Sequence, residues 1–521
     1  MGLTLQLRAW LVAMVVISAG GGYAFFFNRS RLTVKWTVLW LLVTTAAYLC
    51  GNIWLFTLAV YGICAVAPGR DPGKKLSYYF LLLPAVPAHI MYEIPGLVPG
   101  IRYWFALNYP RMLVLFLLIP VLYARLKEGG FKSGRFLESP TDRHVLLYAS
   151  FLLMLGFRNP SFTEAVRNGC LLVLDLVIPY YAISRGVRSE EDFKSVFSAL
   201  FFSAILLSFF GLFEELKRWN VHDGLSRFLD IKAYGYFEGR NLYRENILRV
   251  KTTLGQAIPF GFFLSLALGA GIYLERVFDK KRLFYALSFG LLLGVFFLTL
   301  SRGPWLGFLV FLGTFVLLDP HQTLRRVFGF LLFMLFLFPV VLITPIGQKV
   351  VRVLPFTRHA AGTEQSGTLD YRKNLITQST AIIKKHPWFG SPDSLQTEQM
   401  EELKQGREGI IDVVNSYVQI ALDSGLVGLA LFLWIFAALI VRLFRRIQVK
   451  VERPWIDLIT LGKVLLALLV SILVIIGTVG SITFIPIYYW GIVALAAGYL
   501  SLRENTQNHD CIRTLERTAS L

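Results

Sequence analysis

Long apolar segments alternate with short polar loops along almost the whole chain of 521 residues. A helix needs about 20 mainly apolar residues to cross the hydrocarbon core of a bilayer. By this measure the pattern predicts about fifteen membrane spans. They are expected near residues 8–27, 33–50, 52–67, 76–94, 110–124, 143–157, 168–184, 193–215, 255–274, 282–300, 303–319, 325–345, 415–440, 460–479 and 483–502. The segment 76–94 contains Pro84, Pro87 and Glu93, so it is expected to be broken or re-entrant.

The longest polar interval, residues 346–414, lies between apolar segments and is expected to fold rather than remain a solvated hairpin. Its apolar residues recur at helical spacing in a first stretch and again in a second, shorter one. The first holds Tyr371, Leu375, Ile376, Ile382 and Ile383, and the second holds Leu395, Met400 and Leu403. Amphipathic helices of this kind would lie on the membrane surface or cap a cavity.

The composition supports a membrane protein built from helices. Hydrophobic residues make up 55% of the chain, and the mean hydropathy is +0.58. The apolar runs are continuous rather than alternating, which excludes a β-barrel. The fold class is therefore expected to be all-α, a polytopic transmembrane helical bundle with a large folded extracytoplasmic loop.

The net charge of +19 has a simple explanation in the loops. Much of the Lys and Arg stands in short loops that alternate along the chain with less basic loops, as expected if the basic loops are cytoplasmic. We therefore expect no nucleic-acid partner. The less basic loops would then lie outside: 95–109, 158–167, 216–254, 301–302, 346–414 and the turn near Gly480. With fifteen spans the N-terminus would also lie outside.

These features divide the chain into five regions. They are an N-terminal transmembrane region at 1–250 with the outer loop 216–254, a transmembrane core at 251–345, a long outer loop at 346–414 that would carry the chemistry, C-terminal transmembrane helices at 415–502 and a cytoplasmic tail at 503–521.

Several basic residues fall on the predicted outer face. Arg302 stands between two apolar runs, where its guanidinium could bind phosphate in a bidentate fork or simply anchor the helix at the interface. Arg372 opens the loop helix and could equally be an ordinary surface charge. Arg244, Arg249 and Lys251 precede a span and add positive potential that would attract an anionic head group; a solvated basic loop is the alternative.

The long loop contains two histidines, His359 and His386. Either could transfer a proton, and His386 is also a candidate for substrate binding, although surface or capping roles are more common. The chain has no HExxH, CxxC or GxxxxGK[ST] motif, so no metal site and no cofactor is expected.

Four motifs in a fixed order give the chain a resemblance. They are Thr252-Thr253-Leu254-Gly255-Gln256, Ser301-Arg302-Gly303, Tyr371-Arg372-Lys373 with His386-Pro387-Trp388-Phe389-Gly390, and Asn415 ahead of Gly425-Leu426-Val427-Gly428. In this order the chain resembles the O-antigen ligase and polymerase superfamily of bacterial envelope glycosyltransferases. The resemblance is good over about residues 250–450. The first half of the chain resembles the family only in having many membrane spans.

The resemblance implies a metal-independent glycosyltransferase of the GT-C type in the bacterial inner membrane. Such enzymes move a glycan from an undecaprenyl-diphosphate carrier to a saccharide or lipid-linked acceptor. By motif position, Arg302 and Arg372 correspond to the arginines that hold the donor diphosphate, and Asn415 belongs to the substrate-binding elements.

One position departs from the family pattern. Ligases of this family have His immediately before the Asn, where this chain has Val414. The departure favours a polymerase-like or divergent member, and another residue would have to activate the acceptor. Asp412 is the first candidate and His359 the second, with Glu398 also possible.

Two other classes of function remain open. A transporter or flippase of lipid-linked sugars would also be polytopic and basic, although transporters keep their key polar residues near the membrane midplane. A scaffold protein of an envelope assembly would need no chemistry at all.

Overall fold

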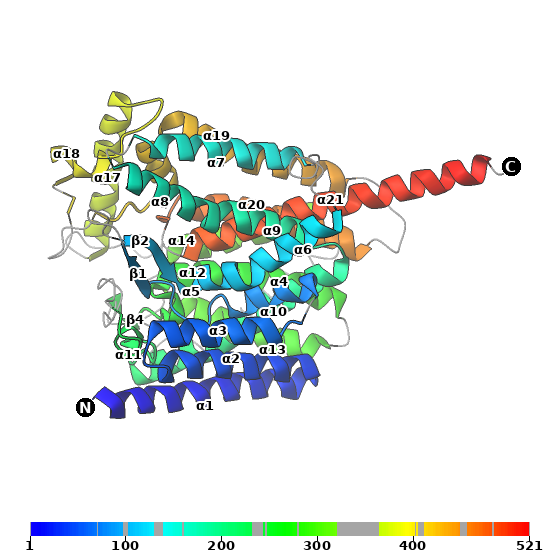
Figure 1. The fold of residues 1–521 in the computed structure, drawn as a ribbon, viewed down its shortest axis with the longest axis horizontal. Coiled ribbons are helices and arrows are strands. Elements are labelled where there is room, and N and C mark those ends of the chain that lie inside the picture. The colour runs from blue at the N-terminus through cyan, green and yellow to red at the C-terminus, as the bar shows by residue number, and fades with distance from the viewer. Residues whose placement is uncertain are drawn as a thin grey trace.

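The protein is described from a computed structural model, and helices dominate it (Figure 1). The described residues are 2–69, 71–96, 103–129, 139–158, 161–231, 243–244, 247–278, 281–319, 364–401, 403–404, 411–448, 456–481 and 484–519. The predicted span at 325–345 and His359 lie outside these residues.

Within the described ranges, nine helical segments are long and apolar enough to cross a membrane, and three apolar helices are shorter. The bounds are α1 (Gly2–Asn28), α2 (Arg31–Leu49), α3 (Ile53–Val66), α4 (Pro72–Leu82), α5 (Tyr109–Leu113), α6 (Ile119–Gly129), α7 (Pro140–Gly156), α8 (Phe162–Leu172), α9 (Ile178–Gly186), α10 (Glu190–Lys217), α12 (Ala257–Val277), α13 (Arg282–Leu298), α14 (Arg302–Leu318), α19 (Ser416–Ile447), α20 (Ile456–Ile476) and α21 (Phe484–Ala519). The predicted all-α polytopic membrane fold is confirmed.

The smaller elements lie mainly between the long helices. They are the strand pairs β1 (Met91–Pro95) with β2 (Tyr103–Asn108) and β3 (Tyr243–Arg244) with β4 (Ile247–Leu248), both antiparallel, the short helices α11 (Leu225–Phe228) and α18 (Glu398–Glu401), the 3-10 turns η4 (Thr252–Leu254) and η6 (Ser394–Gln396), and the loop helix α17 (Glu364–Lys385). Two π-helical turns, η1 (Val114–Leu118) and η3 (Val173–Val177), join α5 to α6 and α8 to α9.

The predicted segment 76–94 is broken, as its prolines suggested. Helix α4 ends at Leu82, and Pro84 and Pro87 follow it. Proline lacks the backbone N–H that a helix interior requires and clashes with the preceding turn. The chain then continues into the hairpin β1–β2, whose first strand begins at Met91.

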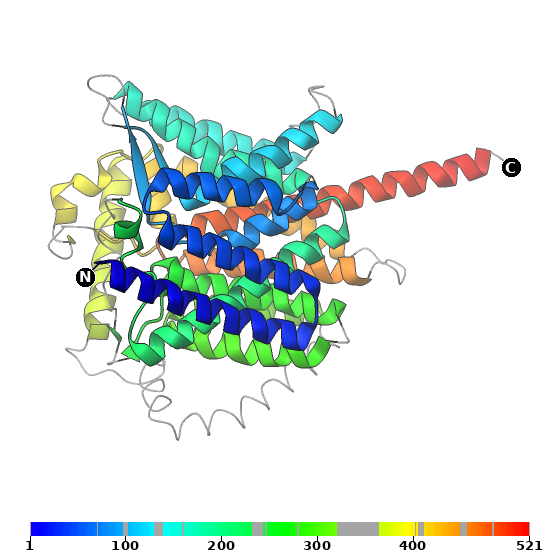
Figure 2. The ribbon, with the colours of Figure 1, turned by 60° about the horizontal axis from the view of Figure 1, so that its bottom comes forward.

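The long helices lie side by side and define two ends of a bundle. Figures 1 and 2 both place the N-terminus, α17 and α18 at one end, which we call the loop end. The described parts of the 216–254 loop, α11 and β3–β4, lie at this end too. The C-terminal part of α21 projects from the opposite end. Which membrane face the loop end meets remains a prediction.

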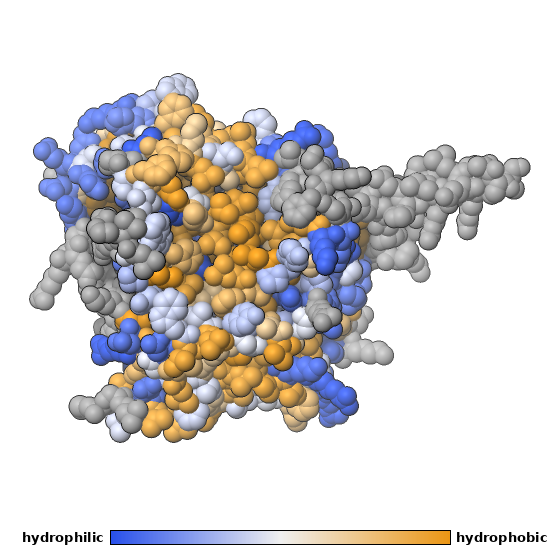
Figure 3. Space-filling view, viewed as in Figure 1, coloured by the Kyte–Doolittle hydropathy of each residue, from blue (hydrophilic) through white to orange (hydrophobic). Residues whose placement is uncertain are grey.

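The surface follows the same division. Apolar side chains cover the middle of the bundle on the face shown in Figure 3, and hydrophilic side chains gather toward its two ends. Exposed apolar residues such as Leu11 of α1, Leu58 of α3 and Trp434 of α19 lie on the outside of the bundle. In water such exposure would be unfavourable, whereas in a bilayer these side chains face lipid.

The 346–414 loop has a small hydrophobic core of its own. Its described buried members are Leu375, Ile382, Met400, Leu403 and Val413, which pack with Leu422 of α19. Both predicted helical stretches contribute to this core, although Ile376 of the first stretch is 49% exposed. The interpretation of this loop as a folded unit is confirmed for its described part.

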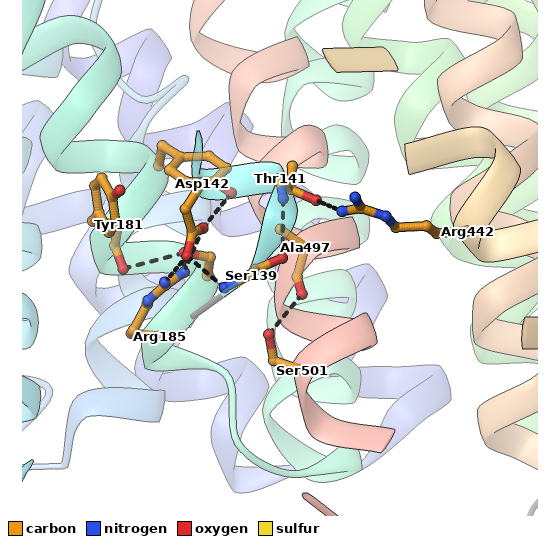
Figure 4. Close-up of polar contacts among 10 residues, drawn as sticks. Ser139, Thr141, Asp142, Tyr181, Arg185, Arg442, Ala497 and Ser501 are labelled. Atoms are coloured by element: carbon orange, nitrogen blue, oxygen red, sulfur yellow. Dashed lines mark hydrogen bonds and ion pairs between the residues drawn. The ribbon is translucent and has the colours of Figure 1, made fainter. Parts of the chain in front are cut away.

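A buried ion pair ties helices together at the end opposite the loop end. Asp142 forms a capping box with Ser139 at the start of α7 and pairs with Arg185 of α9 (Figure 4). The hydroxyl of Tyr180 donates to the same carboxylate at 2.8 Å. A buried carboxylate is tolerated only when it is paired in this way.

Candidate functional site

Segments far apart in the sequence meet at the short turn that follows α20, residues 477–481, which we call the α20 turn. A Cβ atom at Gly303 would lie 2.4 Å from Thr478 Oγ1, so glycine is needed for the close approach of α14. The Arg372 Nη2 atom donates to the Thr478 carbonyl at 3.4 Å. The Ser-Arg-Gly motif and the loop helix α17 therefore converge on one residue.

The start of α19 reaches the same turn. The Ser416 amide and hydroxyl donate to the Val479 carbonyl at 3.0 and 2.8 Å. A Cβ atom at Gly480 would lie 2.4 Å from the Val413 carbonyl oxygen, so the segment before α19 runs directly over the turn. The α20 turn thus holds α14, α17 and α19 in one arrangement.

Arg302 and Arg372 are close enough for their positive charges to repel each other. Arg302 is the first residue of α14, and Ser301 occupies the cap position before it. The N-terminus of a helix already carries positive potential. The added charges of Arg302 and Arg372 are therefore unfavourable there unless an anion is bound. An arrangement of this kind favours the binding of phosphate.

A third arginine joins this pair. Arg249 Nη2 donates to Ser301 Oγ at 3.2 Å, and its Nε donates to the Thr299 carbonyl at 3.4 Å. Lys251, two residues later, is directed elsewhere: it is 3% exposed, and its Nζ lies 3.0 Å from Asp223 Oδ1. We call Arg249, Arg302 and Arg372 the arginine cluster. The predicted role of Lys251 in substrate binding remains a prediction.

The segments that carry Arg249 and Arg302 both contain backbone in the left-handed region. Leu300 has φ 47° and Thr252 has φ 51°, values that cost a residue with a side chain of order 1 kcal/mol or more. The buried carboxylate of Glu214 holds the Thr252 segment by accepting from the Thr252 amide at 2.9 Å and the Lys251 amide at 3.3 Å. Sequence analysis missed Glu214, although a carboxylate at the end of an apolar span could have drawn attention to it.

Asp412 lies close enough to Arg372 for the two charges to interact. The Tyr371 hydroxyl donates to the Asp412 carbonyl at 3.0 Å, and the Asp412 amide donates back to that hydroxyl at 3.1 Å. Burial raises the pKa of the Asp412 carboxyl, and the positive charge of Arg372 acts against this rise. A carboxylate of raised pKa is more basic than an ordinary aspartate, which suits proton transfer.

Asn415 has a visible structural role. Its side-chain oxygen accepts from the amides of Tyr417 at 2.9 Å and Val418 at 3.3 Å, so it caps the N-terminus of α19. Asparagine is among the preferred residues at this position. Its proposed part in substrate binding is a separate matter that remains a prediction.

The remaining predicted site residues do not join the arginine cluster in the described part of the chain. His386 follows α17 and is exposed. Arg244 lies in β3, and its side chain is outside the described residues, as is all of His359.

The His-Pro-x-x-Gly turn docks onto a kink in α19. A Cβ atom at Gly390 would lie 2.4 Å from the Leu422 carbonyl oxygen, and one at Gly425 would lie 2.2 Å from the Trp388 carbonyl oxygen. Gly425 interrupts the helix with φ 71° and ψ −174°, and the Val427 amide donates to the same Trp388 oxygen at 3.3 Å. The His-Pro-x-x-Gly motif and the Gly-x-x-Gly motif that begins at Gly425 are distant in the sequence, and their backbones contact each other directly here.

Replacing Gly425 with alanine is expected to destabilise the protein by more than about 1 kcal/mol, because the new Cβ meets backbone atoms and φ is positive. Gly294 in α13 is a matched control, since nothing lies within 4 Å of a Cβ there. Thermal unfolding of the purified protein should show a lower midpoint for Gly425→Ala than for Gly294→Ala. Equal midpoints would mean that this contact is not rigid.

Sequence analysis also missed Arg158, which follows α7. Its Nη1 donates to the carbonyls of Phe389 at 2.6 Å and Gly390 at 3.0 Å, and its Nη2 donates to the Asp423 carbonyl at 2.8 Å. One guanidinium thus fastens the docked turn to α19. Nothing in the sequence indicates this partnership, because the residues concerned lie more than two hundred positions apart.

Residues 287–433 match the family model of the O-antigen ligases. The match supports the O-antigen ligase and polymerase superfamily that the motifs indicate. It spans Arg302, Arg372 and Asp412, while Arg249 and the α20 turn lie outside it. A comparison with curated proteins finds no match for the chain.

Proposed function

We propose that this protein is a glycosyltransferase that moves a glycan from an undecaprenyl-diphosphate carrier to a saccharide or lipid-linked acceptor. The observation that carries the proposal is the arginine cluster at the loop end. Arg249 bonds to Ser301 next to Arg302, and the charge of Arg372 acts both on Arg302 and on the carboxyl group of Asp412. The family match supports a role in the assembly of O-antigen or related polysaccharide.

In the proposed reaction, a hydroxyl of the acceptor attacks the anomeric carbon of the donor glycan. The bond from that carbon to the diphosphate oxygen breaks, and undecaprenyl diphosphate leaves with the electron pair. Arg302, Arg372 and Arg249 stabilise the charge that develops on the diphosphate, a role for which preorganised donors are effective. Asp412 accepts the proton of the attacking hydroxyl.

The arginine cluster supplies positive charge to the leaving group from the protein itself, and the proposal therefore includes no metal. Val414, in the position where ligases of the family have histidine, favours a polymerase-like member. We propose the bacterial inner membrane as the location, with the loop end outside, because the short basic loops belong to the opposite end.

A direct test is incubation of the purified protein in lipid with an undecaprenyl-diphosphate glycan and a second copy of that glycan as acceptor. The expected products are a lengthened glycan and released undecaprenyl diphosphate. If the same protein in sealed vesicles carries the donor across the bilayer without forming these products, it is a flippase and the proposal fails. If it does neither with intact arginines, a scaffold role is supported instead.

A further inference from the structure

A cleft separate from the arginine cluster opens between α1 and α10 at the loop end. Its volume is about 490 Å³, and its lining consists of Leu5, Arg8, Val12, Phe213, Lys217 and Trp219. Volumes of about 300–1,000 Å³ are common for small-molecule sites. Helix α1 lies on the outside of the bundle, at its bottom edge in Figure 1 and at its front in Figure 2, so the cleft lies where lipid would surround the protein.

The polar part of the cleft is positively charged. Arg8 and Lys217 are both exposed, and neither pairs with a carboxylate among the described residues. The nearby acids are engaged elsewhere: Glu215 pairs with Arg218 at 2.9 Å, and Glu214 accepts from backbone amides. The positive charge of the cleft is therefore available to an anion.

The indole of Trp219 adds a second feature. The Arg8 guanidinium lies over this ring at 5.5 Å from its centroid, which orients the cation toward the cleft. Tryptophan prefers the level of the lipid headgroups, where its ring is half in an apolar environment. A tryptophan beside Arg8 and Lys217 therefore favours a position of these two cations near the lipid phosphates.

The rest of the lining is apolar. Val12 of α1 and Phe213 of α10 lie on the side of the two cations that faces the middle of the bundle. Leu5 lies on the other side of Arg8, nearer the N-terminus, and is 49% exposed. A free phosphate ion would use only the charged end, whereas a molecule with a phosphate head and hydrocarbon chains would cover both parts.

We propose that this cleft binds a phosphate-bearing anionic lipid. The phosphate lies between Arg8 and Lys217, and the hydrocarbon chains follow Val12 and Phe213 toward the middle of the bundle. The site is independent of the proposed transferase activity, because none of its lining residues belongs to the arginine cluster. The same last turn of α10 carries Glu214, so an occupied cleft would also stabilise the helix turn that holds the Thr252 segment.

The test measures lipid binding to the purified protein in detergent. The probes are phosphatidylglycerol, phosphatidylcholine and inorganic phosphate. Wild-type protein is expected to bind phosphatidylglycerol saturably and more tightly than the other two. The double variant Arg8→Gln/Lys217→Gln is expected to bind it roughly 25-fold more weakly, since each cation near a headgroup contributes roughly 5-fold.

Two further variants separate this site from general attraction. Lys384→Gln/Lys385→Gln removes the same charge from exposed positions of α17 at the same end and should bind phosphatidylglycerol like wild-type. Val12→Trp keeps both cations but fills the apolar part, and should weaken lipid binding without changing any weak binding of inorganic phosphate. Equal affinity for phosphatidylcholine, equal losses in the two double variants, or no effect of Val12→Trp would each overturn the proposal.

Discussion

Replacing Arg302 or Arg372 with alanine is expected to lower glycan transfer by roughly 100-fold or more. A preorganised donor that stabilises a developing anion contributes about 3 kcal/mol to the transition state, because it needs no reorganisation during the reaction. Arg302→Lys should restore only part of the rate, since an ammonium group cannot reproduce the planar fork of a guanidinium. The measurement is the initial rate of glycan lengthening with the purified variants.

The stability of the same variants distinguishes a functional role from a structural one. Arg302 places a cation at the N-terminus of α14 and near Arg372, and both of these disfavour a positive charge there. Arg302→Ala is expected to leave the protein folded while its activity falls. Arg445→Ala, an exposed arginine near the end of α19, is the control and should keep full rate. Full activity in Arg302→Ala would contradict the proposal that Arg302 stabilises the diphosphate leaving group.

Asp412→Asn is the second variant with a large expected effect, a rate loss of about 100-fold, which is typical of a lost general base. Asparagine keeps the shape of the side chain and leaves the backbone contacts with Tyr371 in place. Loss of rate without loss of folding would therefore point to the carboxylate itself. Val414→His should be tolerated, because family members with a histidine there share the motif.

The pH profile gives an independent readout. Asp412 can accept a proton only when it is ionised, so the rate should rise with pH as this carboxyl loses its proton. Burial raises its pKa, which moves this acid limb to higher pH than an ordinary aspartate would give. The limb should be absent in Asp412→Asn. If Asp412→Asn and His359→Ala both keep the full rate and the wild-type profile, neither residue is the base.

Hydropathy was sufficient to predict the all-α polytopic class, because a bilayer accepts only segments that satisfy their own backbone hydrogen bonds. It did not give the number of spans: about fifteen were predicted, and the described residues hold nine long apolar helices and three shorter ones. The break after Leu82 followed from two prolines, and the small core of the 346–414 loop followed from helical spacing at Leu375 and Ile382. The order of the short motifs led to the family that residues 287–433 match. Each of these signals is local in the sequence or depends only on composition.

Only the tertiary structure shows which of the candidate site residues come together. That Arg249 bonds to Ser301 and that Arg372 reaches Thr478 follows from how α14, α17 and the α20 turn pack, and no local pattern encodes such distances. Packing also separated residues that look alike in sequence: Arg249 joined the cluster, while Lys251 became buried against Asp223. A charge on a loop can satisfy itself with an internal partner or face a ligand, and only the tertiary fold decides between these outcomes.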